Sequence, residues 1–96
     1  MTGVKADAGK IRFSLLPWDA MRQVVAVLEY GARKYSVDNW RKVPDARRRY
    51  YDAALRHLTA WWEGKSGEPA NDPESGLPHL AHACCCVLFL IALGGD

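Results

Sequence analysis

The stretch that most constrains the fold is residues 72–93. It opens with the turn-like segment Asp72-Pro73-Glu74-Ser75, continues through His79 and His82, and ends in the uncharged apolar run 83–93. Two histidines three residues apart share one face of a helix. Polar groups on an otherwise apolar helix need a hydrogen bond, a metal or a substrate. The sequence therefore predicts a buried helix whose histidines have a partner.

An extended arm and a first helix are expected ahead of this stretch. Residues 1–16 predict an irregular arm, in which Lys10 and Arg12 alternate with apolar residues and so lie on one side. A helix is expected from about residue 17 to residue 30, ended or bent by Gly31. Its predicted core stripe consists of Trp18, Met21, Val25 and Leu28.

A second helix is expected over about 45–63, with Asp45 as its N-cap. Its predicted core stripe is Tyr51, Leu55, Leu58 and Trp62, beside a neighbouring stripe of Tyr50, Ala54, His57 and Trp61. A loop over 64–71, a tight turn over 72–75 and a third helix over about 77–93 complete the pattern. We expect one all-α domain over residues 1–96, a small helical bundle (17–96) with an N-terminal arm (1–16).

Composition and charge exclude several classes of protein. With 96 residues, 49% hydrophobic and 25% charged, the chain is typical of one globular domain. A net charge of +2 is too small to indicate binding to duplex nucleic acid. Residues 1–13 contain no apolar signal region, and the run 83–93 is shorter than the roughly 20 residues of a membrane span. We expect a cytoplasmic protein without a membrane partner.

The three consecutive cysteines do not indicate a metal site. Cys84, Cys85 and Cys86 point about 100° apart on a helix of 3.6 residues per turn, so they cannot converge on one ion. They are interpreted as small buried apolar residues in a reducing compartment.

The candidate polar groups are imidazoles and carboxylates. Such groups suit a divalent transition metal and general acid–base chemistry. They are His57, Asp72, Glu74, His79 and His82. The structural alternative is that His79 and His82 bond to the facing helix or cap the preceding loop. A third reading is direct substrate contact without a metal.

Six motifs, taken in order, identify a family resemblance. They are Asp-x-Gly-Lys-x-Arg at 7–12, Leu-Leu-Pro at 15–17, Tyr-Gly-Ala-Arg-Lys-Tyr at 30–35, Asn-Trp-Arg-Lys at 39–42, Arg-His-Leu-x-Ala-Trp at 56–61 and Asp-Pro-Glu-Ser-Gly-Leu-Pro-His-Leu-Ala-His-Ala at 72–83. In this order they resemble the phage-associated dATP/dGTP diphosphohydrolase N-terminal domain family. That family looks related to the MazG-like all-α pyrophosphohydrolases, which cleave a nucleoside triphosphate to monophosphate and pyrophosphate with Mg²⁺ or Mn²⁺.

The resemblance implies a set of site residues. A purine deoxynucleoside triphosphate, dGTP or dATP, would be the substrate. Phosphates would be neutralised by Lys10, Arg12, Lys34 and Arg56, the base would stack on Tyr35 or Trp40, and Asn39 would read its edge. The catalytic candidates are His79, His82 and Glu74, and the metal candidates are His57, Asp72, Glu74, His79 and His82.

The chain departs from the larger group where that group binds its metal. The MazG-like hallmark is Glu-x-x-Glu on one helix and Glu-x-x-Asp on the next, whereas this chain offers Asp52, His57, His79 and His82. Histidine is a poor ligand for Mg²⁺, so the Mg²⁺ mechanism of that group does not carry over residue by residue. The expected cofactor is a divalent ion, and Mg²⁺, Mn²⁺ and a softer transition metal all stay open. The alternatives are a non-catalytic phage protein that sequesters a nucleotide, and an oligomer with structural histidines.

The third predicted helix indicates that the chain forms an oligomer. It is apolar nearly all round, and three helices of one short chain can hardly surround it. We therefore expect a homo-oligomer, whose spare helix surface packs against another subunit.

Overall fold

The computed structural model describes residues 2–64 and 71–94, and their fold is helical. Its elements are the 3-10 helices η1 (Phe13–Leu15) and η2 (Asn39–Lys42) and the α-helices α1 (Trp18–Lys34), α2 (Ala46–Glu63) and α3 (His79–Ala92). Within the described ranges there is no strand, only an isolated bridge between Asn71 and Pro78. The predicted all-α bundle of three main helices is confirmed.

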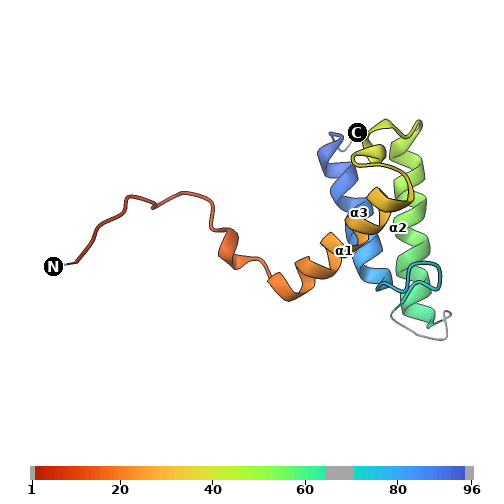
Figure 1. Ribbon diagram of the computed structural model, residues 1–96, viewed down its shortest axis with the longest axis horizontal. Coiled ribbons are helices and arrows are strands. Elements are labelled where there is room, and N and C mark those ends of the chain that lie inside the picture. The colour runs from red at the N-terminus through yellow and green to blue at the C-terminus, as the bar shows by residue number, and fades with distance from the viewer. Residues whose placement is uncertain (1, 65–70, 95–96) are drawn as a thin grey trace.

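Helix α3 is the shared packing element of the bundle. It contacts both α1 and α2, and α2 runs alongside it (Figure 1). Val24 and Val27 of α1 pack on Ala81 and Cys85 of α3. The thiol of Cys85 donates to the Val24 carbonyl oxygen at 3.4 Å. Small side chains on α3 therefore let the helices approach closely, which confirms that Cys85 is a packing residue.

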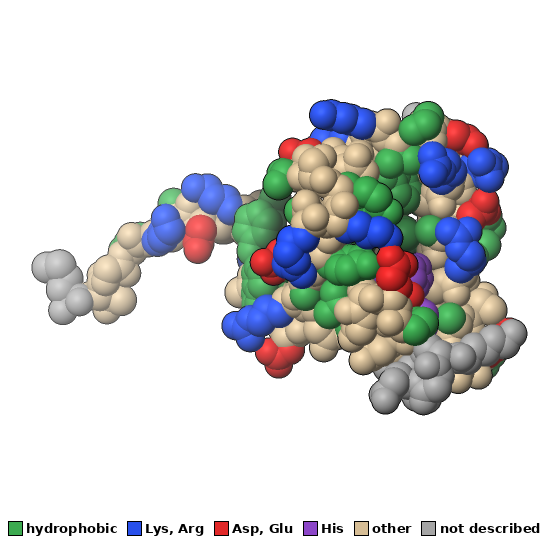
Figure 2. Space-filling model, turned by 45° about the vertical axis from the view of Figure 1, so that its right-hand side comes forward, with side chains coloured by type: hydrophobic (Ala, Val, Ile, Leu, Met, Phe, Trp, Pro, Cys, Tyr) green, Lys and Arg blue, Asp and Glu red, His purple; other side chains and the backbone are tan. Residues whose placement is uncertain are grey.

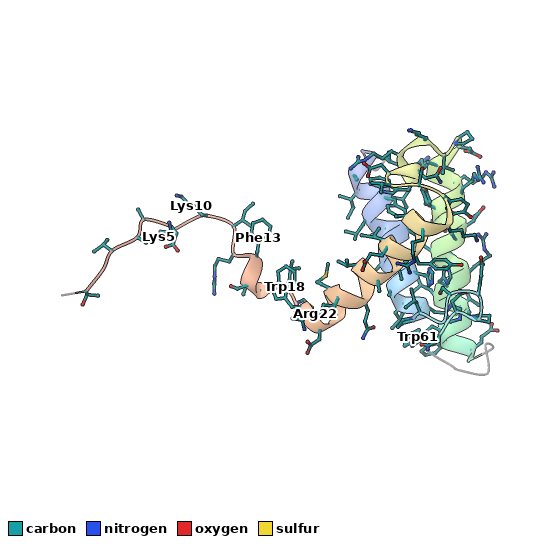
Figure 3. All side chains as sticks on the ribbon, in the orientation of Figure 1. Lys5, Lys10, Phe13, Trp18, Arg22 and Trp61 are labelled. Atoms are coloured by element: carbon teal, nitrogen blue, oxygen red, sulfur yellow. The ribbon has the colours of Figure 1, made fainter. Side chains whose placement is uncertain are left out.

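The N-terminal arm extends away from the bundle (Figures 1 and 3). It is irregular, as predicted, apart from the short turn η1, and it contributes to a longest dimension of 58 Å. Its apolar side chains Ile11, Phe13 and Leu15 are between 65% and 79% exposed. The arm therefore adds nothing to the core of the single chain.

Helix α1 differs from its prediction in length and in its buried face. It continues through Gly31 to Lys34, because the helical hydrogen bonds go on and Tyr35 N–H donates to the Gly31 carbonyl. Trp18 and Val25, predicted to be core residues, are about half exposed, and the buried residues are Val24 and Val27. Met21 and Leu28, the other two predicted core residues, are partly buried and pack against this core.

The predicted core stripe of α2 is wrong. Tyr51, Leu55, Leu58 and Trp62 are between 40% and 79% exposed. The neighbouring stripe faces α3 instead, with Ala54 only 6% exposed and Tyr50 against Phe89 at 5.0 Å between ring centroids. Ala54 is small enough to bring the helix axes together, which explains why this face is buried. A broad apolar face of α2 remains uncovered.

The segment between α1 and α2 is held in an unusual backbone conformation. Asp38 and Asp45 flank η2, and both adopt left-handed conformations with φ of 62° and 56°. Asp45 occupies the predicted N-cap position of α2, but its side chain makes no capping bond. Its carboxylate accepts from Arg48 Nε at 2.7 Å instead, and Arg48 also reaches Asp52 at 3.2 Å. The unfavourable cation in the first turn is thus balanced by local carboxylates.

Two further expectations concern the loop and the membrane. Most of the loop predicted over 64–71 lies outside the described residues, apart from Gly64 and Asn71. Among the described helices, none is long and apolar enough to cross a membrane.

Candidate functional site

The loop before α3 is a tightly bonded turn, as predicted for residues 72–75. The Asp72 carboxylate accepts from Ser75 N–H at 2.9 Å, and the Asp72 carbonyl accepts from Gly76 N–H at 2.8 Å. Ser75 Oγ accepts from Leu77 N–H at 3.1 Å. Gly76 has a φ of 73°, which a residue without Cβ adopts at little cost. The turn fixes Asp72 and Ser75 beside the first turn of α3.

Three histidines from two helices meet at this turn. His57 of α2 lies with its Nδ1 3.0 Å from Nδ1 of His79. Its ring stacks on the ring of His82, with centroids 4.5 Å apart and planes 9° apart. His82 Nε2 is 2.7 Å from Ser75 Oγ and 3.9 Å from an Asp72 oxygen. Residues far apart in sequence thus form one imidazole–carboxylate cluster.

The cluster satisfies only part of its hydrogen-bonding capacity. The bonds of the structural alternative are present, because His79 bonds to the facing helix and His82 bonds to the preceding loop. However, His79 is only 4% exposed, and its Nε2 has no hydrogen-bond partner among the described residues. A buried polar atom without a partner costs about 1–3 kcal/mol. One buried nitrogen of the cluster therefore has no hydrogen-bond partner in the described part of the chain.

Electrostatics favour neutral imidazoles and an ionised carboxylate. Burial, reinforced by the neighbouring His82, lowers the pKa of His57 to about 4. Burial also lowers the pKa of His82. For Asp72, burial alone would raise the pKa, but the hydrogen bonds from Ser75 outweigh it and the pKa is lowered. At neutral pH these are the ionisation states that metal ligands need.

Glu74 lies in a different set of contacts. Its carboxylate pairs with Lys34 and accepts from the Tyr30 hydroxyl at 3.0 Å. These bonds lower the pKa of Glu74, and the pairing with Glu74 raises the pKa of Lys34. The ligand atoms that lie within 4.8 Å of one another belong to His57, Asp72 and His79. Glu74 therefore faces Lys34 rather than this group.

One pocket of about 1430 Å³ contains the cluster. Figure 2 shows histidine side chains in a hollow of the surface, with acidic and basic groups close by. Of the candidate residues from the sequence, the lining includes Lys34, Tyr35, Asn39, Trp40, Arg56, His57, Asp72, Glu74, His79 and His82. Lys10 and Arg12 do not line it, since they lie on the arm that leaves the bundle.

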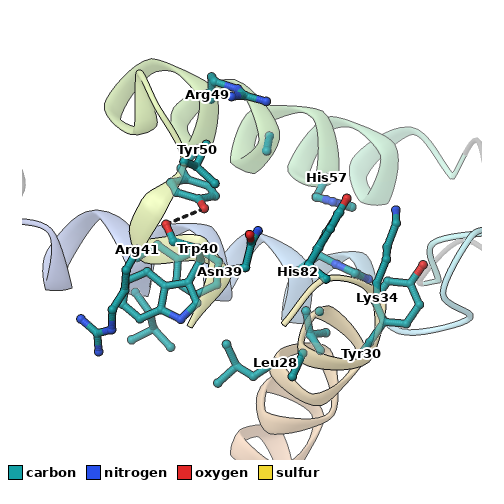
Figure 4. A pocket seen from close by; sticks show the side chains of 18 of the residues that line it. Leu28, Tyr30, Lys34, Asn39, Trp40, Arg41, Arg49, Tyr50, His57 and His82 are labelled. Carbon is teal, nitrogen blue, oxygen red and sulfur yellow. Dashed lines mark hydrogen bonds between the residues drawn. The ribbon is translucent and has the colours of Figure 1, made fainter. Parts of the chain in front are cut away.

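The far wall of the pocket is an aromatic and basic layer (Figure 4). The Trp40 ring stacks on Phe89 with centroids 4.5 Å apart, and the Arg41 guanidinium lies 4.1 Å from the Trp40 centroid. Both faces of Trp40 are therefore covered. Tyr35, the other predicted stacking residue, is 63% exposed.

Several residues in or beside the pocket were not predicted from the sequence. Ser75 contacts His82 without lining the pocket, and it lies three residues after Asp72 in a pattern typical of an Asx turn, so the turn chemistry could have identified it. Tyr30 and Arg41 line the pocket and belong to motifs that the sequence analysis identified through other residues. Further lining residues include Arg48, Arg49, Tyr50 and Phe89.

Comparisons with known proteins agree on one family. A family model described as dATP/dGTP diphosphohydrolase, N-terminal, matches residues 1–94. A curated protein of Salmonella phage PMBT28, named dATP/dGTP diphosphohydrolase, is 37% identical over 93 residues. The match covers 97% of this chain but only 30% of the phage protein. No solved structure matches the chain.

Proposed function

We propose, from the premise that this chain belongs to the dATP/dGTP diphosphohydrolase N-terminal family, that its pocket binds a purine deoxynucleoside triphosphate. The proposed reaction is metal-dependent hydrolysis to the monophosphate and pyrophosphate. The phage relative is named for dATP and dGTP, and this chain spans 30% of its length. The activity is therefore a proposal for this segment in its own right.

The observation that carries the proposal is the convergence of three kinds of group in one pocket. A cluster of histidines with a carboxylate, a set of cations and exposed aromatic surface all line a single volume of about 1430 Å³. Ligand pockets of roughly 300–1,000 Å³ accept drug-sized molecules, so a nucleotide fits this volume. A helical bundle without a ligand would not need histidines, cations and exposed aromatic rings around one pocket.

The phosphates are assigned to the basic side chains of the pocket. Arg49 and Arg56 are exposed on α2 and line the pocket, and the hydrogen bond of Arg49 is to the Pro44 carbonyl at 3.3 Å. Guanidinium groups bind phosphate oxygens in bidentate fashion. Lys34 adds a third cation, and Glu74 together with Tyr30 holds it in place.

The base is assigned to Tyr35 rather than Trp40. Tyr35 offers an exposed ring, whereas both faces of Trp40 are already covered by Phe89 and Arg41. The Asn39 side chain lies between the basic wall and the histidines and can bond to a base edge (Figure 4).

We assign the hydrolysis step to the end of the pocket that contains the histidines. His82 Nε2 accepts from the Ser75 hydroxyl, and burial lowers the pKa of His82, so the neutral imidazole could take up a proton from attacking water through that hydroxyl. His57, His79 and Asp72 are the residues that would hold the divalent ion. When bound, such an ion neutralises phosphate charge and lowers the pKa of water.

The test is a product assay on the purified chain. We expect dGTP or dATP, with Mn²⁺, Co²⁺ or Mg²⁺, to give monophosphate and pyrophosphate in equal amounts on anion-exchange chromatography. Saturable nucleotide binding without turnover for any triphosphate and any metal would instead support the alternative of a non-catalytic sequestering protein. That alternative needs the cations and Tyr35 but not the histidine cluster.

Assembly as a homo-oligomer is part of the proposal. The chain exposes 7420 Å², whereas a compact monomer of its 10.7 kDa would expose about 5,500 Å². The extended arm supplies part of this excess, and the exposed apolar residues Tyr51, Leu55, Leu58 and Trp62 of α2 supply another part. The exposed apolar face of α2 is the surface we assign to a second copy of this chain.

A further inference from the structure

We propose that the pocket binds one transition-metal ion, of the zinc, cobalt or nickel class, through His57, His79 and Asp72, and that Mg²⁺ is not its ion. The proposal rests on the proposed function for the reaction that the ion would serve. It goes further by naming the class of metal and its ligands, and by removing His82 and Glu74 from the ligand set.

The spacing of the ligand atoms supports a shared ion. One ligand atom from each of the three residues lies within 4.8 Å of the others. The two Nδ1 atoms of His57 and His79 are 3.0 Å apart. Two nitrogens bound at 2.0–2.1 Å to one ion lie roughly 2.9–3.4 Å apart, for angles between 90° and tetrahedral. In the free protein a proton must sit between these nitrogens, and a metal can replace it.

The other nitrogen of His79 shows that hydrogen bonds within the described residues do not fully account for this buried imidazole. Its ring is 4% exposed and lines the pocket, yet Nε2 bonds to nothing in the described part of the chain. If Nδ1 donates to His57, Nε2 is a bare lone pair; if Nδ1 accepts, Nε2–H lacks an acceptor. Either tautomer leaves a buried group unsatisfied. An ion on Nδ1 would fix the proton of His79 on Nε2, so it would select one of these two tautomers.

The donor set selects the class of ion. Two imidazole nitrogens and one carboxylate oxygen suit zinc, cobalt and nickel, whereas Mg²⁺ prefers oxygen ligands in an octahedron. The Mg²⁺-dependent group that the sequence resembles uses carboxylates from both helices. Here α3 supplies only histidines to the cluster, so these residues do not fit Mg²⁺.

His82 and Glu74 are excluded by their existing bonds. Ser75 Oγ already accepts from Leu77 N–H, so its own proton is directed to His82 Nε2 at 2.7 Å. That nitrogen is therefore an occupied acceptor, and the His82 ring supports His57 by stacking. Glu74 is bound to Lys34 and Tyr30. Both residues are positioning residues in this proposal.

The experiment is a metal titration of the whole chain without nucleotide. Elemental analysis after dialysis against Zn²⁺ or Co²⁺ should give one ion per chain, and excess Mg²⁺ should not displace it. His57→Gln, His79→Gln and Asp72→Asn should each weaken Co²⁺ binding by more than about 100-fold, beyond the loss expected for a supporting group. His82→Phe, which keeps the ring stack, and Glu74→Gln should retain it within about 10-fold.

Further measurements distinguish a loss of metal binding from a loss of folding. Circular dichroism checks that each variant is folded, and Zn²⁺ should raise the melting temperature of the wild type but not of His79→Gln. Equal Co²⁺ binding by wild type and His79→Gln, or no transition-metal binding at all, would overturn the proposal. Nucleotide turnover with Mg²⁺ alone would overturn it while leaving the proposed function intact. Metal binding without turnover would support the site and contradict the hydrolase.

Discussion

His79→Ala distinguishes a chemical role of the cluster from a structural one. The variant loses the hydrogen bond to His57 Nδ1, which costs about 1 kcal/mol because His57 lines the pocket, where water can replace the partner. It also removes the unpartnered Nε2, which returns about 1–3 kcal/mol. The space opened joins the pocket and adds little further cost. The two contributions sum to between no change and about 2 kcal/mol of stabilisation, so we expect that His79→Ala does not lower the free energy of unfolding.

The assay is thermal denaturation followed by circular dichroism at fixed protein concentration. A change of 1 kcal/mol corresponds to a shift of about 4–8 °C in melting temperature for a domain of this size. Val27→Ala, in the core between α1 and α3, is the matched reference and should cost about 1.5–3 kcal/mol. Nucleotide turnover of His79→Ala should fall by orders of magnitude. A variant that is as destabilised as Val27→Ala, yet fully active per folded molecule, would refute this reasoning.

Three other predictions test the pocket, the assembly and the cysteines. Arg56→Ala should weaken nucleotide affinity, measured by calorimetry, by about 1.5–3 kcal/mol, whereas Arg12→Ala on the arm should change it little; the reverse order would place the arm in the site. Leu58→Glu should convert the oligomer to a monomer in light scattering, and a wild type that is already monomeric would contradict the proposed interface. Burial raises the pKa of Cys85 to about 12 and of Cys86 to about 11, so both stay protonated below pH 9. Their labelling by iodoacetamide should be slow until the protein unfolds.

The sequence was sufficient for the helices because their signals are local. The three helices and the Asp72–Ser75 turn depend on neighbours a few residues away, and the structure contains them, although α1 continues past Gly31. The grouping of His57 with His79 and Asp72 was also within reach, since imidazoles and carboxylates on apolar helices need partners. The distances between these side chains could not be predicted, because they depend on how α2 and α3 pack.

The errors arise where two faces of a helix compete. On α2 the stripe through Leu58 has the larger apolar side chains and was predicted to be buried. The stripe through Ala54 is buried instead, because the small alanine lets α2 approach α3 closely. No periodicity reveals which of two adjacent apolar stripes is buried. The contacts of Glu74 were also beyond the local pattern of the sequence. Its partner Lys34 lies 40 residues away, and only the tertiary fold brings them together.

The two left-handed aspartates around η2 have a consequence for ligand binding. Asp38 and Asp45 hold the ends of the segment that carries Asn39 and Arg41, in conformations that cost non-glycine residues energy at folding. That wall of the pocket is therefore preorganised. Ordering a mobile side chain at the moment of binding costs about 0.5–1.5 kcal/mol, and a rigid wall avoids this penalty. A ligand that contacts this wall therefore binds without the cost of ordering the segment.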